Sequence, residues 1–509
     1  MHGTLEFRNE LIRAQAYYAV AGPARQHLHR GIGEMLAARR QEGPQRAELE
    51  LAWHFLSGDQ LSEAVTHGIA GADDALRVGA PYEAERILKV LLRKSVPESS
   101  RSRVRLMLTK ALLDQSKAEA ALPMVDALTS EGGLLPRETA EVARMKATSL
   151  YLINRDTGRS HLAAADEALG AAKRVNDVEL VARALFEYAR AGAEAGDEER
   201  VRDAQVQIDQ VLSMNPSARE IPVLHYALGF CHYFFFEPQA AAASLEVAKE
   251  LLAATSNSTE LSFTYNGYAN CKTHLGEFDE ARLSYLAALD LARKIGDDSR
   301  ASIITGNLCG LLTMMGDYLS ATEFGLRSVE FGKRALSQPA LAGCFTSLAE
   351  AYTLAGDAAR ASECLQCADD WVRKERRWSA NVDYLCQRAC TALLTANLGL
   401  ALTLIGRAEE MAWGRERTVP NPGVFEKLRI LRATHVSGPD EALRIASEAK
   451  ARFRGRHPLY HLTVVVAAAW LERRTIGSLS PEAQAGLQAL EAPRLAGLRA
   501  LNAAQGFLS

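Results

Sequence analysis

Four cysteines have a spacing that metal sites use. Cys364 and Cys367 are three residues apart, and eighteen residues separate this pair from Cys386 and Cys390. Two such pairs resemble the thiolate ligand set of a structural zinc ion, which is tetrahedral. The alternative is that the four thiols are small apolar side chains in a helical interior. The choice depends on the elements that carry them.

A second candidate is the segment from Trp371 to Trp378, which interleaves cations with aromatic rings. Such a segment could contact phosphates or stack on bases. It is also typical of a helix C-terminus, where the helix dipole favours cations, and we prefer that interpretation. Elsewhere no base, nucleophile and orienting group form a recognisable set. The sequence therefore predicts that the chain is not an enzyme and assigns no catalytic residue, cofactor or metal.

The elements that carry these residues are predicted by an internal repeat of 40 residues. Alanine recurs at this step at Ala241, Ala281, Ala321, Ala361 and Ala401, and the same step backward reaches Val201, His161 and Ala121. Twelve residues before each marker stands a small residue: Ser149, Ala189, Gly229, Ala269, Cys309, Ala349 and Ala389. Helices cross closely only where both side chains are small. The repeat therefore predicts stacked pairs of helices.

Glycine followed by an acidic residue marks the predicted turn within each pair. Examples are Gly196-Asp197, Gly276-Glu277, Gly316-Asp317 and Gly356-Asp357. Glycine adopts the left-handed conformation that ends a helix, and the carboxylate favours the N-terminus of the next one. We predict an all-α fold, a right-handed α-solenoid (superhelix) of about nine or ten helical hairpins.

This register decides between the two interpretations of the cysteines. It places Cys364 and Cys367 on the second helix of one pair, and Cys386 and Cys390 on the next first helix, on either side of Ala389. We therefore expect core thiols in place of a zinc site. The predicted organisation is residues 1–42 as an N-terminal junction with capping helices, residues 43–455 as the repeat superhelix, and residues 456–509 as C-terminal capping helices.

The better candidate site is the concave wall of the superhelix. First-helix residues one position after the small contact residue, and at helical steps from it, should line this wall. They combine aromatic rings with amide and guanidinium donors, which suits an extended peptide or a small polar ligand. The run Phe234–Phe236 is equally consistent with packing between repeats. The predicted groove residues are Phe186, Arg190, Tyr226, Phe230, Tyr233, Phe234, Asn266, Asn270 and His274.

Composition limits the partners. The 59 Lys and Arg residues nearly balance the 62 Asp and Glu residues, so no chain-wide field favours nucleic acid or an anionic membrane. The longest apolar run, Leu462–Leu471, is about half the length that a membrane crossing needs. The start, Met1–Arg13, lacks a secretory pattern, and eight cysteines are too few for a disulfide scaffold. We expect a cytoplasmic protein.

The offsets of small and large side chains from about Ala121 to Ala408 resemble the tetratricopeptide repeat (TPR). The period is 40 instead of about 34 residues, and the family's proline after the second helix is absent. Both departures are similar to the longer-looped TPR-like repeats of bacterial signal-transduction (STAND-class) ATPase regulators. The resemblance implies that the chain is the sensor solenoid of such a regulator.

The N-terminus also resembles that class, which includes LuxR-type and maltose-regulator-like activators. Leu5–Tyr17 and Arg25–Arg30 are similar to the junction in which a strand and a helix close a winged-helix domain before the repeats, although Asn9 replaces the usual histidine. The chain has no Gly-x-x-x-x-Gly-Lys-Ser/Thr phosphate loop, and its C-terminus, Ala492–Ser509, has no convincing DNA-binding helix pair.

The resemblance implies a sensor or regulatory arm of a transcriptional or signal-transduction regulator that lacks the ATPase and DNA-binding domains. The expected partner is a protein, a peptide or a small regulatory ligand in the concave groove. Neither a membrane nor nucleic acid is expected to bind this chain alone. The sequence leaves open a second function, a free-standing TPR adaptor that assembles a protein complex.

Overall fold

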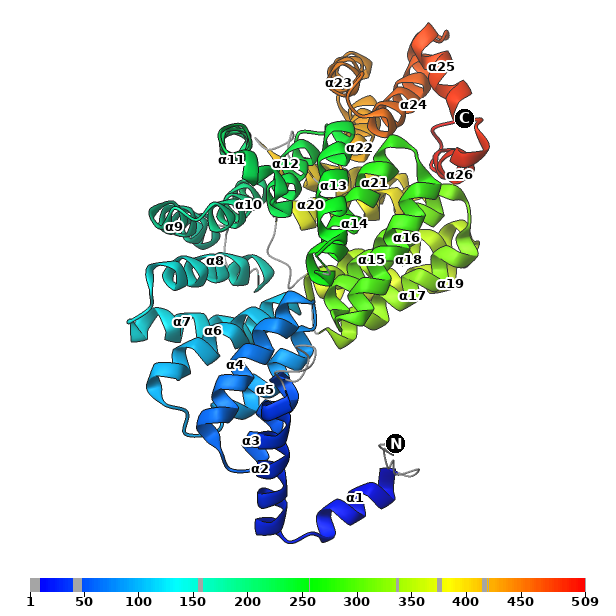
Figure 1. Cartoon of the computed structure of the whole chain (residues 1–509). Helices are drawn as coiled ribbons and strands as arrows, with labels where there is room; N and C mark the ends of the chain where they lie inside the picture. The colour runs from blue at the N-terminus through cyan, green and yellow to red at the C-terminus, as the bar shows by residue number, and fades with distance from the viewer. Residues whose placement is uncertain are drawn as a thin grey trace. The chain divides into compact units, whose positions relative to one another are not determined.

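A computed structural model describes residues 10–39, 48–153, 159–255, 257–335, 338–372, 378–413, 419 and 421–508 of the chain. Within these ranges the chain forms 26 α-helices and two short 3₁₀ helices, with no strand (Figure 1). The predicted all-α repeat fold is confirmed. No described helix is long and apolar enough to cross a membrane.

The contacts divide the chain into two compact units, Met1–Leu134 and Leu135–Ser509. The first unit packs its helices around Leu51, Phe55, Leu88, Leu91 and Leu108, all at most 4% exposed. Residues 1–9, including most of the strand that the N-terminal resemblance implies, lie outside the described residues. The helices of this unit are α1 (Glu10–Ala19), α2 (Gly22–Arg39), α3 (Glu48–Ser57), α4 (Leu61–Arg77), α5 (Pro81–Leu92), α6 (Glu98–Asp114) and α7 (Ala118–Glu131).

The second unit is a series of antiparallel helix pairs, each of which packs on the next. Its first helices are α8 (Pro136–Ile153), α10 (Val178–Ala195), α12 (Pro222–Phe234), α14 (Ser258–Leu275), α16 (Asp298–Met315), α18 (Gln338–Leu354), α20 (Trp378–Leu394), α22 (Pro422–Val436) and α24 (Pro458–Thr475). Their partners are α9 (Arg159–Val175), α11 (Glu198–Met214), α13 (Pro238–Ala253), α15 (Phe278–Lys294), α17 (Tyr318–Arg334), α19 (Ala358–Val372), α21 (Leu398–Ala412), α23 (Pro439–Phe453) and α25 (Pro481–Ala489). The last helix is α26 (Ala496–Ala504).

The residues that mark the repeat are buried, as their positions in the 40-residue register predict. The marker alanines from Ala241 to Ala401 are at most 4% exposed, and each lies near the start of a second helix. The small residues Ala189, Ala269, Cys309, Ala349 and Ala389 are fully buried on the first helices. At Gly229, a Cβ would lie 2.8 Å from the Leu245 side chain and 3.2 Å from the Ala241 carbonyl oxygen. A larger residue there would separate the paired helices.

The turns also follow the predicted chemistry. Gly196, Gly276 and Gly316 end their helices with φ of 73°, 78° and 85°, a conformation that only glycine adopts without strain. The carboxylate of Asp197 accepts a hydrogen bond from the Arg200 amide, and Asp317 accepts one from the Ser320 amide, at 3.0 and 3.1 Å. Each acidic residue therefore caps the helix that follows it.

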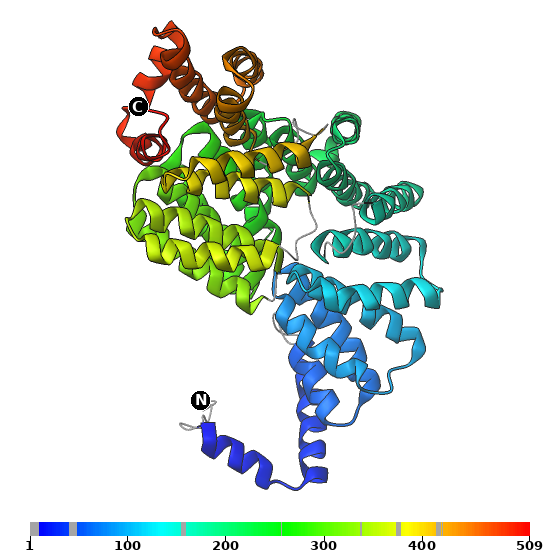
Figure 2. The same ribbon diagram turned by 180° about the vertical axis from the view of Figure 1, so that it is seen from behind.

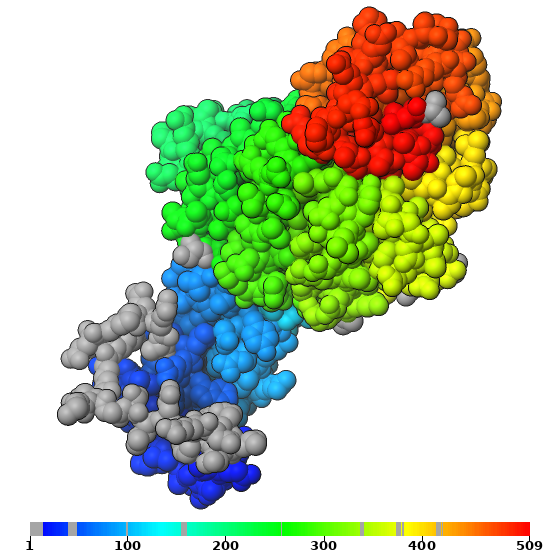
Figure 3. Space-filling view, turned by 90° about the vertical axis from the view of Figure 1, so that its right-hand side faces the viewer, coloured from blue at the N-terminus to red at the C-terminus, as the bar shows by residue number. Residues whose placement is uncertain are grey.

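The second unit closes on itself, which the sequence did not predict. Helix α24 packs against α14, and α26 packs against α16 and α20. Figures 1 and 2 show α24 beside the middle hairpins from opposite sides, and in Figure 3 the C-terminal residues, in red, lie directly against the green surface of those hairpins. Trp378 Nε1, at the start of α20, donates to the Glu194 carbonyl oxygen at 3.0 Å. The predicted C-terminal capping helices thus also contact repeats far back in the chain.

Candidate functional site

The nine predicted groove residues lie half-buried on three successive first helices. Phe186 and Arg190 are on α10, and Asn266, Asn270 and His274 are on α14. Helix α12, between them, carries Tyr226, Phe230, Tyr233 and Phe234. The structure arranges eight of them in three contact groups along this wall, and Phe234 lines a separate cleft. We name the wall formed by α10, α12 and α14 the inner wall.

The first group is aromatic and carries a cation. The Phe186 ring packs edge-to-face with the rings of Tyr226 and Phe230, with centroid distances of 5.1 and 5.5 Å. The Arg190 guanidinium stacks over the Tyr151 ring at 3.9 Å and forms an ion pair with buried Glu187. Burial raises the pKa of Tyr226 to about 12. The group therefore offers neutral aromatic faces beside an arginine that is paired with Glu187.

The second group is made of amides. Asn307 Nδ2 on α16 donates to Asn266 Oδ1 at 3.1 Å and lies 3.4 Å from Asn270 Oδ1. The Tyr285 hydroxyl donates to the same Asn270 oxygen at 2.5 Å. Amide side chains both donate and accept, as a peptide backbone does. This group suits the backbone of an extended ligand.

The third group joins the inner wall to the C-terminal helices. The Tyr233 hydroxyl lies 2.8 Å from His274 Nε2, and the His274 ring packs on His457 and Tyr460 at 4.7 and 4.9 Å. Burial lowers the pKa of His274 to about 4, and it lowers that of His457 further. Both imidazoles are neutral at pH 7. His274, predicted to line an open groove, is instead a contact between α14 and α24.

Helix α26 is held by a buried lysine that sequence reasoning missed. Lys427 Nζ on α22 donates to Asn502 Oδ1 at 2.9 Å and Gln505 Oε1 at 2.5 Å, and it lies 4.5 Å from the Phe507 ring centroid. Burial lowers the pKa of this lysine. Nearby, burial raises the pKa of Glu350 and of Asp383 to about 6. A lysine in a helical pattern carries no sequence signal of burial, because it is usually exposed.

A cleft of about 940 Å³ opens where the α10/α11 and α12/α13 turns face α22 and α23. Phe234, Phe235 and Phe236 lie along one side, and α22, α23 and the turn after α23 form the other. We name it the junction cleft. Its size is within the range of ligand sites, and its lining is rich in arginine and glutamate. Phe234 and Phe235 line this cleft and also pack against the core of the neighbouring repeats, and Phe236 packs on Phe453 and Tyr460.

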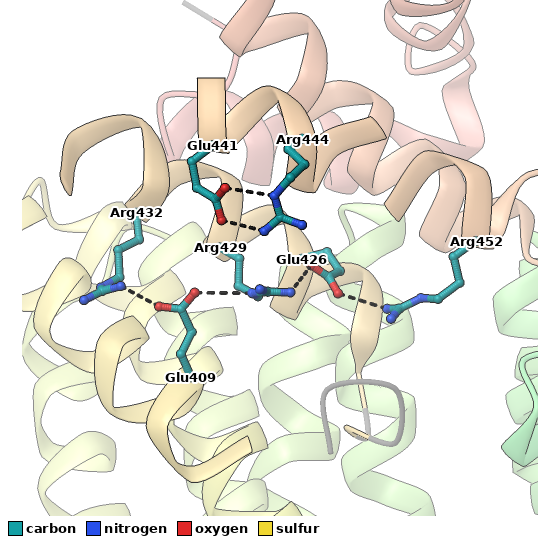
Figure 4. Close-up of polar contacts among 7 residues, drawn as sticks. All are labelled: Glu409, Glu426, Arg429, Arg432, Glu441, Arg444 and Arg452. Carbon is teal, nitrogen blue, oxygen red and sulfur yellow. Dashed lines mark hydrogen bonds and ion pairs between the residues drawn. The ribbon is translucent and has the colours of Figure 1, made fainter. Parts of the chain in front are cut away.

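The wall of the cleft on α22 and α23 is a network of ion pairs (Figure 4). Buried Glu426 accepts from Arg429 Nη1 at 3.0 Å and from Arg452 Nη2 at 3.1 Å. Arg429 and Arg432 also donate to Glu409, at 3.3 and 2.7 Å. The carboxylate of Glu426 is therefore neutralised from two sides, and this wall is held rigid.

Phe236 has a strained backbone. It lies at the α12–α13 turn with φ of 60°, where the turns after α10, α14 and α16 have glycine. The left-handed region costs a non-glycine residue about 1–2 kcal/mol. The ring packs edge-on against Phe453 and Tyr460, at 6.1 and 6.0 Å. This contact offsets the strain and fixes the α12–α13 turn to the end of α23 and the start of α24.

The cysteine pairs lie on the helices that the register predicted, α19 and α20. Cys364, Cys386 and Cys390 are buried, whereas Cys367 is exposed. Burial raises the pKa of Cys364 to about 11 and that of Cys390 to about 12, which disfavours the thiolate that binds metals. Among the described residues, no group of three or more His, Cys, Asp or Glu could hold a metal ion. Of the Trp371–Trp378 segment, residues 373–377 lie outside the described residues.

Comparison with solved structures agrees with the repeat fold. A Rap protein complexed with competence and sporulation factor aligns with 70% of this chain and 99% of its own, at 14% identity and a TM-score of 0.50. NprR in complex with its cognate peptide NprX aligns with 75% of this chain and 97% of its own (14% identity, TM-score 0.48). The Cut9–Hcn1 hetero-tetramer aligns with 82% of this chain and 75% of its own (14% identity, TM-score 0.49). No protein-family model and no curated protein sequence matches the chain. The likeness shows a TPR-like helical repeat fold.

Proposed function

We propose that this chain is a non-enzymatic superhelix that binds a protein or peptide partner on its inner wall. In this proposal it serves as the sensor arm of a bacterial signal-transduction or transcriptional regulator. The Rap protein of similar fold is complexed with competence and sporulation factor, which supports a role of this kind. The resemblance of the N-terminus to STAND-class regulators supports the regulatory setting. In this proposal the function of the chain is to bind a partner, and it catalyses no reaction.

The observation that carries the proposal is the inner wall itself. Aromatic faces at Phe186 and Tyr226 and amides at Asn266 and Asn270 follow one another along neighbouring first helices. An extended peptide presents side chains and backbone amides in the same alternation. Arg190 lies at one end of the series, stacked on Tyr151 and already paired with buried Glu187, so a ligand carboxylate would share this guanidinium with Glu187.

Regulation would act through the closed contacts of the second unit. Helix α24 packs on α14, and α26 packs on α16. A ligand on the inner wall near His274 would compete with α24 for the same surface. Binding would therefore shift the population toward a form in which the C-terminal helices are released.

The test is a selection from a displayed random peptide library against the full chain. Selected peptides should lose at least tenfold in affinity on the variant Arg190→Gln with Asn266→Ala, provided that its thermal unfolding matches the wild type. Small-angle scattering should then show a change of shape with the bound peptide. Peptides that bind the variant equally well would contradict the inner wall as the site.

The second candidate is the free-standing adaptor, and the closed contacts favour it. A superhelix held through Trp378, α24 and α26 presents one fixed surface and has little freedom to switch. Stable partners captured without any added ligand, together with scattering that does not change, would support the adaptor over the sensor.

A further inference from the structure

We propose that the junction cleft is a second binding site, specific for a peptide segment that carries an acidic side chain next to an aromatic or aliphatic one. This site goes beyond the proposed function, because only Phe234 of the nine predicted groove residues lines it and because helices from distant parts of the chain form it. Only the closure of the second unit creates it.

The rings provide the apolar contact. Phe234 and Phe235 are half-buried and meet edge-to-face at 5.2 Å. Phe236 is locked into Phe453 and Tyr460, so the turn that carries all three rings is fixed. A fixed, half-exposed aromatic pair offers a contact surface without loss of conformational entropy on binding.

The charges provide the selectivity. Three of the four lining carboxylates are already paired: Glu426 with two arginines, Glu448 with Arg444 at 2.7 Å, and Glu237 with His232 at 2.8 Å. Two lining arginines, Arg202 and Arg456, are exposed and have no carboxylate partner within the described ranges. The five lining arginines also outnumber the four lining glutamates by one, so the lining itself carries an excess of positive charge.

Arg202 is also held in position. Its guanidinium lies over the Phe235 ring, 4.4 Å from the ring centroid. A carboxylate beside Phe235 would receive two parallel hydrogen bonds from such a group. Glu198, one helical turn before Arg202, is the remaining lining carboxylate and would compete with a ligand for the arginine.

The same charges argue against a nucleic acid. A phosphate backbone is negative at every step and needs a continuous cationic groove. Here the lining also contains the glutamates Glu198, Glu237, Glu426 and Glu448. An isolated carboxylate next to an apolar side chain fits this pattern, whereas a polyanion would meet several like charges.

The experiment is a peptide array built around a central phenylalanine, in which each of the two positions on either side is varied through all other residues. The labelled full-length chain should bind peptides with aspartate or glutamate at one or more positions at least tenfold better than those with asparagine or glutamine. The variant Arg202→Gln with Arg456→Gln should abolish this preference, and Glu198→Gln should strengthen it. Arg282→Gln, at an exposed arginine on α15, is the matched control and should leave the pattern unchanged.

Three outcomes would overturn the proposal. They are an array without acidic preference, an acidic preference that survives in the arginine variant, and labelled oligothymidine that binds more tightly than the best peptide with the same arginine dependence. The inner-wall variant Arg190→Gln with Asn266→Ala should retain the array pattern. Failure of the proposed inner-wall function is therefore distinguishable from failure of the junction cleft.

Discussion

Replacement of Phe236 separates two opposing effects at the α12–α13 turn. Phe236→Ala removes the ring from Phe453 and Tyr460 but keeps a Cβ in the left-handed region. Deletion of a fully buried phenylalanine side chain costs about 3–5 kcal/mol, and this ring is half-buried, so we expect a loss of about 2 kcal/mol. Phe236→Gly also relieves about 1–2 kcal/mol of strain, reduced by about 0.5–1 kcal/mol through the greater entropy of unfolded glycine.

The expected order of stability is therefore wild type, then Phe236→Gly, then Phe236→Ala. Native-state hydrogen exchange is the suitable assay, because repeat arrays open locally. A loss of 2 kcal/mol corresponds to about 30-fold faster exchange at the amides of α12, α13 and the start of α24. Exchange should rise on both sides of the contact, since the ring joins them.

The matched control is Ala396→Gly. Ala396 has φ of 56° at the α20–α21 turn and is exposed, so it has the strain without a buried ring. This variant should slow exchange there by a few-fold, because only the strain is removed. Two results would refute this explanation. The first is a Phe236→Gly chain that is as stable as the wild type. The second is Phe236→Gly exchanging like Phe236→Ala while Ala396→Gly exchanges like the wild type, which has alanine at that position.

Three further predictions concern the rest of the second unit. Gly497→Ala should release α26 and expose the C-terminus to limited proteolysis, because the new Cβ would lie 2.2 Å from the Thr313 carbonyl oxygen; an unchanged digestion pattern would contradict this close approach. The folded-state pKa of Asp383, raised to about 6, lies above its unfolded value near 4, so its contribution to stability is fully present below pH 4 and is lost as pH rises through 6. The melting temperature of the wild type should therefore fall more steeply between pH 4 and 6 than that of Asp383→Asn, and equal slopes would refute the assignment. Cys367 is the one exposed thiol of the eight, so a disulfide reagent should modify one cysteine rapidly in the folded protein and the rest only on unfolding; rapid modification of a second thiol would contradict the burial.

The repeat register could be predicted from the sequence because it depends on local rules. Gly276 and Asp317 determine a helix end and a helix start through backbone conformation and capping, and both act within a few residues. Ala281 and Ala269 are small because the paired helices touch there, and neighbours in a hairpin are close in the chain. The same register placed the cysteines on α19 and α20 and the nine predicted groove residues on α10, α12 and α14. That these residues bind a partner remains a prediction.

The closure of the second unit could be recognised only from the tertiary structure. Contacts such as Trp378 with Glu194 and α24 with α14 join residues nearly two hundred positions apart, and they result from small rotations that accumulate over many repeats. No local pattern encodes that sum. Phe236, Lys427 and the arginines of the junction cleft therefore look ordinary in the sequence, and their chemistry follows from what the returning helices bring against them. The sequence determined the repeat and the phase of each side chain, and the tertiary structure decided which of those side chains face a partner and which face the chain itself.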